Sequence, residues 1–263
     1  MHERAERHSV EKLREHLPAA IVLIAGVALW EAVVFVFSID FYLLPAPHVI
    51  FANLRENYAL LLEAGLYTFT EAAAGYALGC GSGMLAAMAA SRSPAFADLV
   101  LPYAIASASV PIIALAPLAI VWFGVDQGSK VAIVSLMTFF PTFISALRGL
   151  LAVPAPAVEL MRSCAATPRQ IFWKLRLPHS VPYVFTALRA CTTLAMIGAV
   201  VSEFFGGPVK SLGVYIKSSA SLFQTRQAWS AILVTCALGL GFYFAVVLAE
   251  RLAAPWQAER GEI

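Results

Sequence analysis

The chain has 263 residues, of which 60% are apolar and 13% are charged, with a formal net charge of +2 and a mean hydropathy of +0.78. About 25% of residues are charged in soluble domains, so this composition excludes an ordinary soluble protein and indicates an integral membrane protein. The net charge is too small to indicate a nucleic-acid partner.

The first predicted elements are a surface helix and a membrane span. Residues 1–17 carry basic side chains among several glutamates, which predicts an amphipathic helix at the membrane surface. The apolar run 18–38 is too long for a signal-peptide core, so we predict that it stays as the first span. Its Glu31 is either a functional group or a carboxylate that lies near the outer interface or is paired within the bundle.

A second span is predicted over 66–90, after an amphipathic helix outside the bilayer. Gly75, Gly79 and Gly83 recur in it at intervals of four residues and therefore share one side of a helix. Such a stripe of small residues predicts the close approach of another helix. Glu71 falls in the first turns of this span, at a helix interface or at the outer membrane surface.

The third predicted span, 99–124, contains two prolines. Pro111 and Pro117 each remove a backbone donor, so the segment between them is expected to be kinked or locally unwound. Irregular backbone is tolerated at membrane depth only where protein or a watery cavity satisfies the freed carbonyls. Two interpretations stay open here, a packing kink and a wall of a transport pathway.

Three further spans are predicted over 130–147, 183–205 and 229–249. The predicted fold class is therefore an all-α integral membrane protein with six transmembrane helices. We expect no separate soluble domain. The expected parts are a cytoplasmic amphipathic segment (1–17), a transmembrane domain (18–255) and a cytoplasmic tail (256–263).

The longest polar interval between apolar segments ends at Pro182 and lies in a loop that we bound at 150–182. Thr167 can cap a short helix, with Pro168 at its first position and Gln170 completing a capping box. This helix is expected to stop just before Pro178. It is amphipathic and too short to be stable alone, so it needs its own protein, lipid headgroups or a partner to pack against. Its apolar face has Ile171, Phe172 and Leu175, and its basic residues are Arg169, Lys174 and Arg176.

The distribution of Lys and Arg residues predicts the orientation. If the N-terminus is cytoplasmic, 13 of them fall on the cytoplasmic side and 5 on the other. Cytoplasmic loops carry the excess of basic residues, so we predict that both termini and the helix after Thr167 are cytoplasmic.

The loop resembles the EAA loop of the permease subunits of bacterial ATP-binding-cassette importers. That pattern has a glutamate, a glycine or alanine six residues later, and an (I/L)-x-L-P end after nine more. Here these are Glu159, Ala165 and the run Leu175 to Pro178. The chain departs from the pattern in having Leu160 and Met161 where two alanines are usual, and in having Ala165 where glycine is usual.

Other segments look like the subgroup of these permeases that imports nitrate, sulfonates, taurine and pyrimidine or flavin-type vitamin precursors. These segments are LLPAPHVIFANL, ALAPLAIVWFGVDQGSK, FFPTF and GAVVSEFFGG. The resemblance covers most of the chain and implies a type I importer permease fold with a cytoplasmic coupling helix, in a bacterial inner membrane. The implied partners are a second copy of the chain, two cytoplasmic subunits that bind ATP and Mg, and an extracytoplasmic solute-binding protein.

By this resemblance the loop couples the spans to the ATPase, with Phe172 as the expected anchor in the ATPase groove. The coupling residues are then Glu159, Ala165, Thr167, Pro168, Arg169, Gln170, Phe172, Leu177 and Pro178.

Candidate residues for the translocation pathway lie in the third and fifth spans. Glu203 either contacts the solute or is a structural carboxylate paired with the following loop. Arg189 is expected to snorkel to the cytoplasmic surface. The pathway candidates are Pro111, Pro117, Met196, Ser202 and Glu203.

Several kinds of chemistry are missing from the sequence. It has no Gly-Lys pair and hence no Walker A loop, and it has no HExxH or GxSxG motif. We therefore predict no catalytic site, no metal site and no cofactor bound by this chain. We interpret the cysteines as packing residues, since they form no CxxC pair: Cys80, Cys164, Cys191 and Cys236.

Without a Walker A loop, energy must come from a partner or from an ion gradient. An ion-coupled secondary transporter is the alternative from another class, although the internal repeats common in such proteins are not detected. For the solute, the FFGGP end of the fifth span favours a heterocyclic vitamin precursor such as a pyrimidine or flavin. Sulfonate, taurine or nitrate stays the alternative.

Overall fold

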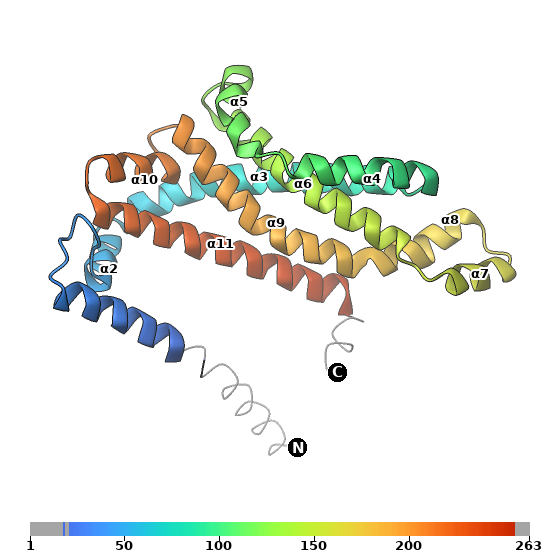
Figure 1. Cartoon of the computed structure of the whole chain (residues 1–263), viewed down its shortest axis with the longest axis horizontal. Coiled ribbons are helices and arrows are strands. Elements are labelled where there is room, and N and C mark those ends of the chain that lie inside the picture. The colour runs from blue at the N-terminus through green and yellow to red at the C-terminus, as the bar shows by residue number, and fades with distance from the viewer. Residues whose placement is uncertain (1–17, 19–20, 256–263) are drawn as a thin grey trace, which may run out of the picture. The chain divides into compact units, whose positions relative to one another are not determined.

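The structure is a computed structural model that describes residue 18 and residues 21–255. In this part of the chain every regular element is helical, which confirms the all-α class. The predicted surface helix of residues 1–17 and the tail 256–263 lie outside the described residues. After a first helix, Ile21–Val36, the elements are α2 (Pro47–Glu56), α3 (Tyr58–Ala90), α4 (Pro94–Ala108), the 3-10 helix η1 (Ile112–Leu115), α5 (Ala116–Phe123), α6 (Gln127–Leu151), α7 (Ala155–Ser163), α8 (Pro168–Ile171), the π-helix η2 (Phe172–Arg176), α9 (Leu177–Phe205), α10 (Leu212–Ser221) and α11 (Thr225–Ala253) (Figure 1).

Within the described residues, four helical segments are long and apolar enough to cross a membrane. A fifth is obtained if the bent pair Ala95–Ala108 and Ile112–Phe123 counts as one span, and the first helix is apolar but shorter. The integral membrane class is therefore confirmed, whereas the number of six spans stays a prediction. The four segments are Tyr58–Ala90, Gln127–Leu151, Pro168–Phe205 and Thr225–Ala253.

The third predicted span is broken, as its prolines indicated. The chain bends by 71° between α4 and the segment that starts at Ile112. Pro111 stands directly before η1, and Pro117 lies in the first turn of α5, where a missing N–H leaves no helical hydrogen bond unmade. The two prolines thus lie where the regular helix is interrupted.

The helices fall into two compact units, which we describe separately. The first consists of residues up to 59 together with 216–232. In this unit the rings of Trp30 and Trp229 lie 5.1 Å apart, and the Ser230 hydroxyl donates a hydrogen bond to the carbonyl oxygen of Ile50 at 3.1 Å. These contacts join segments that are far apart in the sequence.

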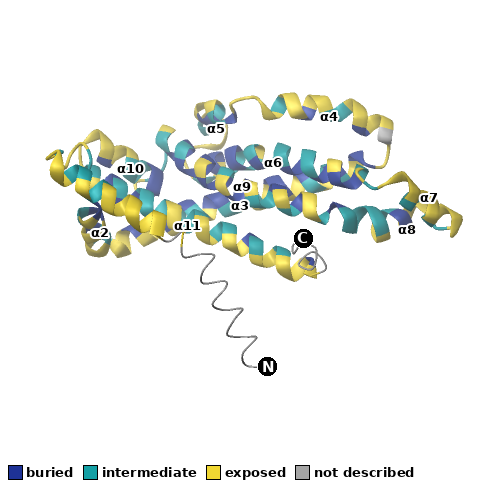
Figure 2. Cartoon of the chain, turned by 60° about the horizontal axis from the view of Figure 1, so that its bottom comes forward, coloured by how far each residue is buried: buried dark blue, intermediate teal, exposed yellow. Residues whose placement is uncertain are grey.

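The second unit, residues 60–215 and 233–263, contains the bundle formed by α3, α4, α6 and α9. Among the candidate spans, α6 and α9 have the largest buried share, whereas α4 exposes most of its surface (Figure 2). At one end of this bundle lie α7 and α8, and α5 lies at the other (Figure 1).

The glycine stripe of α3 packs against α6, as the sequence predicted. A Cβ atom added to Gly75 would lie 2.5 Å from the Cβ of Val134, and one added to Gly83 would lie 2.7 Å from the carbonyl oxygen of Phe139. An added Cβ at Gly79 would collide with the Thr138 side chain. Because each glycine has no side chain, the two backbones can lie in direct contact.

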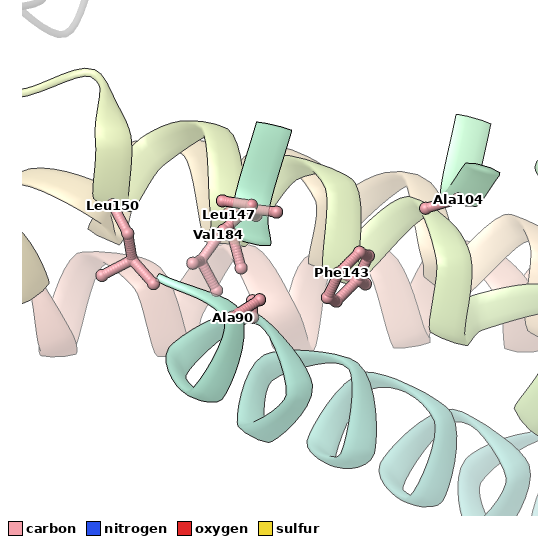
Figure 3. Packing of buried hydrophobic residues seen from close by; sticks show 9 residues of the cluster. Ala90, Ala104, Phe143, Leu147, Leu150 and Val184 are labelled. Atoms are coloured by element: carbon pink, nitrogen blue, oxygen red, sulfur yellow. The ribbon is translucent and has the colours of Figure 1, made fainter. Parts of the chain in front are cut away.

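A cluster of apolar side chains joins α3, α4, α6 and α9 near the end of the bundle where α7 and α8 lie. Phe143, Leu147 and Leu150 of α6 are buried there against Ala90 of α3 and Val184 of α9 (Figure 3). The segment between α6 and α9 packs against this cluster through Phe172.

We expect Gly79→Ala to lower the free energy of unfolding by about 1–3 kcal/mol, because the added methyl group overpacks the contact between α3 and α6. Gly81 lies on the same helix and has open space around an added Cβ. Gly81→Ala is therefore the matched control, and it should leave stability unchanged or raise it by up to about 1 kcal/mol. Denaturant unfolding of the detergent-purified variants measures both values. Equal unfolding free energies would contradict the close approach.

Candidate functional site

The segment between α6 and α9 contains two helical stretches, α7 and the continuous α8–η2, of which the sequence predicts one. The additional helix, α7, begins after Pro154 and has Pro156 in its first turn, a position that proline favours. Glu159 lies on α7 and is exposed to solvent, as is Leu160, whose side chain is 66% exposed. The Ala-Pro-Ala-Val sequence after Pro154 was the available signal for this helix.

Ala165 ends the turn after α7 in the left-handed region, with φ at +57°. This conformation costs an L-residue with a Cβ about 1–2 kcal/mol, and glycine adopts it at no such cost. Ala165 is the position where the EAA pattern usually has glycine. The departure from that pattern therefore places a strained residue in the turn between α7 and α8, two residues before the N-cap Thr167.

The capping box at Thr167 is confirmed. The Thr167 side chain accepts a hydrogen bond from the backbone N–H of Gln170 at 3.3 Å, and the Gln170 side chain accepts one from the backbone N–H of Thr167 at 2.8 Å. Pro168 occupies the first helical position. Two otherwise unpaired backbone donors are thus satisfied at the start of α8.

The predicted helix stop before Pro178 is wrong. The chain passes without interruption from α8 through the π-helix η2 into α9, and the N–H of Leu177 bonds to the carbonyl oxygen of Phe172, five residues earlier. Pro178 lies in the first turn of α9. The wider π turn accommodates a proline ring that would crowd a regular α turn, so the helix continues. We call the segment Thr167–Arg176 the coupling segment, after the role that the resemblance to importer permeases implies.

The coupling segment has one buried and one exposed side. Ile171 is buried, and the partly buried Phe172 packs against the apolar cluster at the end of the bundle, as does Leu177, the residue that follows the segment. Trp173 is 55% exposed, and its ring meets the Phe172 ring edge-on, with the two ring centres 5.6 Å apart. Trp173 is therefore the large aromatic side chain that this segment presents to solvent, whereas the resemblance and the sequence pattern pointed to Phe172.

A cavity of about 900 Å³ lies beside the coupling segment. Apolar side chains, including those of Met88 and Ile171, form part of its wall, and none of the described residues that line it is acidic. The Arg176 guanidinium donates a hydrogen bond to the carbonyl oxygen of Ser91 at 3.4 Å, which ties the segment to the turn after α3. The cavity is strongly basic, since its wall includes Arg92, Arg162, Arg169 and Arg176.

The pathway candidates lie in two places. Pro111 and Pro117 are exposed at the break after α4. Met196 and Ser202 are buried within α9, where the Ser202 hydroxyl donates a hydrogen bond to the carbonyl oxygen of Ala199. In the described chain the pathway candidates therefore lie on separate elements, at the break after α4 and within α9.

Glu203 is fully buried near the end of α9. One of its oxygens accepts a hydrogen bond from the Thr68 hydroxyl at 2.8 Å, and the other accepts one from the backbone N–H of Gly213 at 2.6 Å. The carboxylate is thus held by α3 and by the first turn of α10. This is the geometry expected of a structural carboxylate.

Two further charged residues of the predicted spans have partners. In the first unit, Glu31 lies 2.5 Å from Nδ1 of His48 and accepts a hydrogen bond from the His48 backbone N–H at 3.4 Å. In the second unit, Arg189 of α9 lies 3.4 Å from Glu250 of α11. Each pair joins two helices, so a structural role accounts for the charge of Glu31 and for that of Arg189.

The chain belongs to the family of binding-protein-dependent transport system inner membrane components, whose model matches residues 79–255. A probable ABC transporter permease protein of Haemophilus influenzae is 30% identical over 86% of this chain and 92% of that protein. The formylaminopyrimidine transport permease protein ThiX of Halalkalibacterium halodurans is 30% identical over 83% of this chain and 88% of that protein.

The riboflavin transport system permease protein RibX of Chloroflexus aurantiacus is 28% identical over 92% of this chain and 90% of that protein. Relatives also include permeases named for aliphatic sulfonates in Bacillus subtilis and for taurine in Escherichia coli. The fold matches a chain of the MetNI methionine ABC transporter in an inward-facing conformation, with a TM-score of 0.56 and 19% identity over 80% of this chain and 98% of that chain. The protein is thus a type I ABC importer permease of the sulfonate, taurine and pyrimidine subgroup.

The strain at Ala165 gives a direct prediction. Ala165→Gly should stabilise the turn before the coupling segment by up to about 1 kcal/mol, because glycine adopts positive φ without a Cβ clash. Ala166→Gly is the matched control, since Ala166 is not in the left-handed region, and it should loosen the same turn. Hydrogen exchange of the amides from 165 to 171 reports the change. Faster exchange in Ala165→Gly would contradict the assignment of strain to this residue.

Proposed function

We propose that the chain is the translocation subunit of an ATP-driven importer and works as a homodimer with two cytoplasmic ATP-binding subunits. ATP and Mg are held by those subunits, and an extracytoplasmic solute-binding protein delivers the solute. The observation that carries the proposal is the capped coupling segment, which continues as one helix into α9 and has an exposed aromatic side chain.

In the proposed mechanism, closure of the ATPase dimer on ATP pulls the coupling segment with it. The spans then move from an inward-facing to an outward-facing arrangement, and hydrolysis resets them. A rigid segment transmits such a movement better than a hinged one. The capping box, the buried Ile171 and the bond from Arg176 to Ser91 all support rigidity here.

The contact with the ATPase is proposed to involve the exposed side of the coupling segment and α7. Trp173 and Leu160 are large apolar side chains exposed there, and the neighbouring cavity is lined with arginines. An apolar anchor surrounded by charged residues is the usual composition of such an interface. Phe172 is proposed to support this contact surface from its buried side, because its side chain packs on the apolar cluster of the bundle.

The proposed orientation has both termini and the coupling segment in the cytoplasm of a bacterium, in agreement with the excess of basic residues on that side. We propose that Pro111, Pro117, Met196 and Ser202 lie along or near the pathway. The break between α4 and η1 supports this, because irregular backbone inside a membrane protein needs a polar or protein-lined environment.

For the solute, we propose a heterocyclic vitamin precursor of the pyrimidine or flavin class. The names of ThiX and RibX, which concern formylaminopyrimidine and riboflavin, support this choice. Sulfonate or taurine is the second candidate, because other relatives carry those names. Calorimetric titration of the cognate solute-binding protein with one member of each class decides between them.

Trp173→Ala should reduce the amount of ATPase subunit that co-purifies with the tagged chain by about tenfold or more, since a central aromatic anchor often contributes over 2 kcal/mol to a small interface. The variant should fold normally because the side chain is exposed. Trp122 of α5 is 67% exposed at the opposite end of the bundle, so Trp122→Ala is the matched control and should leave co-purification unchanged.

Phe172→Asp should also uncouple transport, but with some loss of stability, because Phe172 is packed against the apolar cluster. Normal ATPase assembly and normal transport in both Trp173→Ala and Phe172→Asp would rule out the proposed docking surface.

A further inference from the structure

A cluster of buried polar side chains lies where α3, α6 and α9 meet the start of α10. Glu71, Lys130 and Glu203 have no exposed surface, and neither has Thr68. Ionisable side chains at such a depth are costly and need a reason. All four residues belong to the second unit.

The packing of α3 on α6 explains why Glu71 and Lys130 meet. Gly75 contacts Val134, and Gly79 contacts Thr138, so steps of four residues on one helix match steps of four on the other. Four residues before Gly75 on α3 is Glu71, and four residues before Val134 on α6 is Lys130, so these two residues also face each other. Lys130 therefore lies close to Glu71, and it is also close enough to Glu203 to offset the charge of that carboxylate.

Glu203 has the environment of an ionised carboxylate. Thr68 and the N–H of Gly213 donate hydrogen bonds to its two oxygens, and the Thr68 hydroxyl in turn accepts one from the N–H of Leu212 at 3.0 Å. Leu212 and Gly213 are the first two residues of α10. A helix N-terminus with free N–H groups favours a negative charge beside it.

Glu71 has the opposite environment. Both of its oxygens are buried, and no N–H or O–H group of residues 21–255 donates a hydrogen bond to either of them. The Ser211 hydroxyl is also buried without a partner, so it does not supply the missing donor. An ionised carboxylate in this position would leave every lone pair unsatisfied, at a large cost in free energy.

The carboxyl group of Glu71 lies beside that of Glu203, because Thr68, which donates to Glu203, stands three residues before Glu71 on the same side of α3. Two carboxylates cannot bond to each other without a proton between them. Lys130 supplies a single positive charge, and its ammonium group also donates hydrogen bonds to the backbone carbonyls of Val125 and Asp126. With one proton on the pair, the cluster is neutral.

We propose that Glu71 and Glu203 form a proton-binding site in which Glu71 is the neutral carboxylic acid and donates its O–H to the Glu203 carboxylate. The bound proton satisfies Glu71, leaves one negative charge opposite Lys130, and keeps Glu203 available to hold the N-terminus of α10. Glu71 is thus a positioning residue, which acts on α10 through Glu203.

Other charged groups face the site and do not replace the proton. Asp126 precedes α6 and interacts with Lys130. Tyr67 of α3 faces the acidic residues, and the Lys210 ammonium lies 4.7 Å from the centre of its ring. None of these side chains donates a hydrogen bond to Glu71.

Neutral substitution distinguishes the two acids. Glutamine reproduces the shape and the donor capacity of a protonated glutamate, so Glu71→Gln should give folded protein with the melting temperature of the wild type. In Glu203→Gln the charge opposite Lys130 is lost and an amide replaces an acceptor, so the yield of folded protein should fall severely. Glu63→Gln, at an exposed position of α3, is the control for the loss of a carboxylate on this helix.

Infrared spectroscopy reads the proton directly. Detergent-purified protein labelled with ¹³C-carboxyl glutamate should show the carbonyl band of a neutral carboxylic acid at neutral pH. The band should be absent in Glu71→Gln and unchanged in Glu63→Gln. Because alkaline pH removes the proton from the wild type only, its melting temperature should fall more between neutral and alkaline pH than that of Glu71→Gln.

Three results would overturn the proposal. The first is the absence of an acid band in the wild-type protein, because both carboxyl groups would then be ionised. The second is persistence of the band in Glu71→Gln, which would put the proton on another residue. The third is a Glu71→Gln variant that fails to fold, since glutamine should mimic the neutral acid.

Discussion

The contact between the backbones of α3 and α6 is the constraint on which the second unit depends. Glycines at every fourth position of α3 bring the two helices together and set their register. The same register puts Glu71 beside Lys130, so the buried ionisable groups depend on a glycine contact that begins one helical turn away. If the helices separated, these charges would lose their partners in a medium that does not solvate them, which is far more costly than the lost van der Waals contact alone.

The second structural feature of consequence is the continuity of Pro168–Phe205, which has 38 residues. At about 1.5 Å per residue such a helix is roughly 55 Å long and extends from the coupling segment to Glu203. Under the proposed function, a movement of the coupling segment reaches the first turn of α10 without passing a hinge. The π turn before Pro178 makes this possible, because it accommodates the proline within the helix.

Local patterns in the sequence predicted much of this architecture. The capping box at Thr167, the close packing of the glycine stripe and the break near Pro111 each depend on residues within a few turns of one another, and all three were confirmed. The passage through Pro178 was predicted wrongly, because proline was taken to end a helix that a π turn allows to continue. The exposure of Trp173 and the partners of Glu203 depend on contacts between segments far apart in the chain. Hydropathy and spacing carry no information on such contacts, so the sequence left both interpretations of Glu203 open.

The central claim is that the spans of this chain are driven by a partner ATPase through the coupling segment. The most direct test is solute uptake into vesicles that contain the chain alone or the chain with its ATP-binding subunit, with the loaded solute-binding protein on the other side of the membrane. The account predicts uptake only when both subunits are present and ATP is supplied to the ATPase side. Accumulation of solute by the chain alone, driven by an imposed proton or sodium gradient, would contradict it and would indicate a secondary transporter.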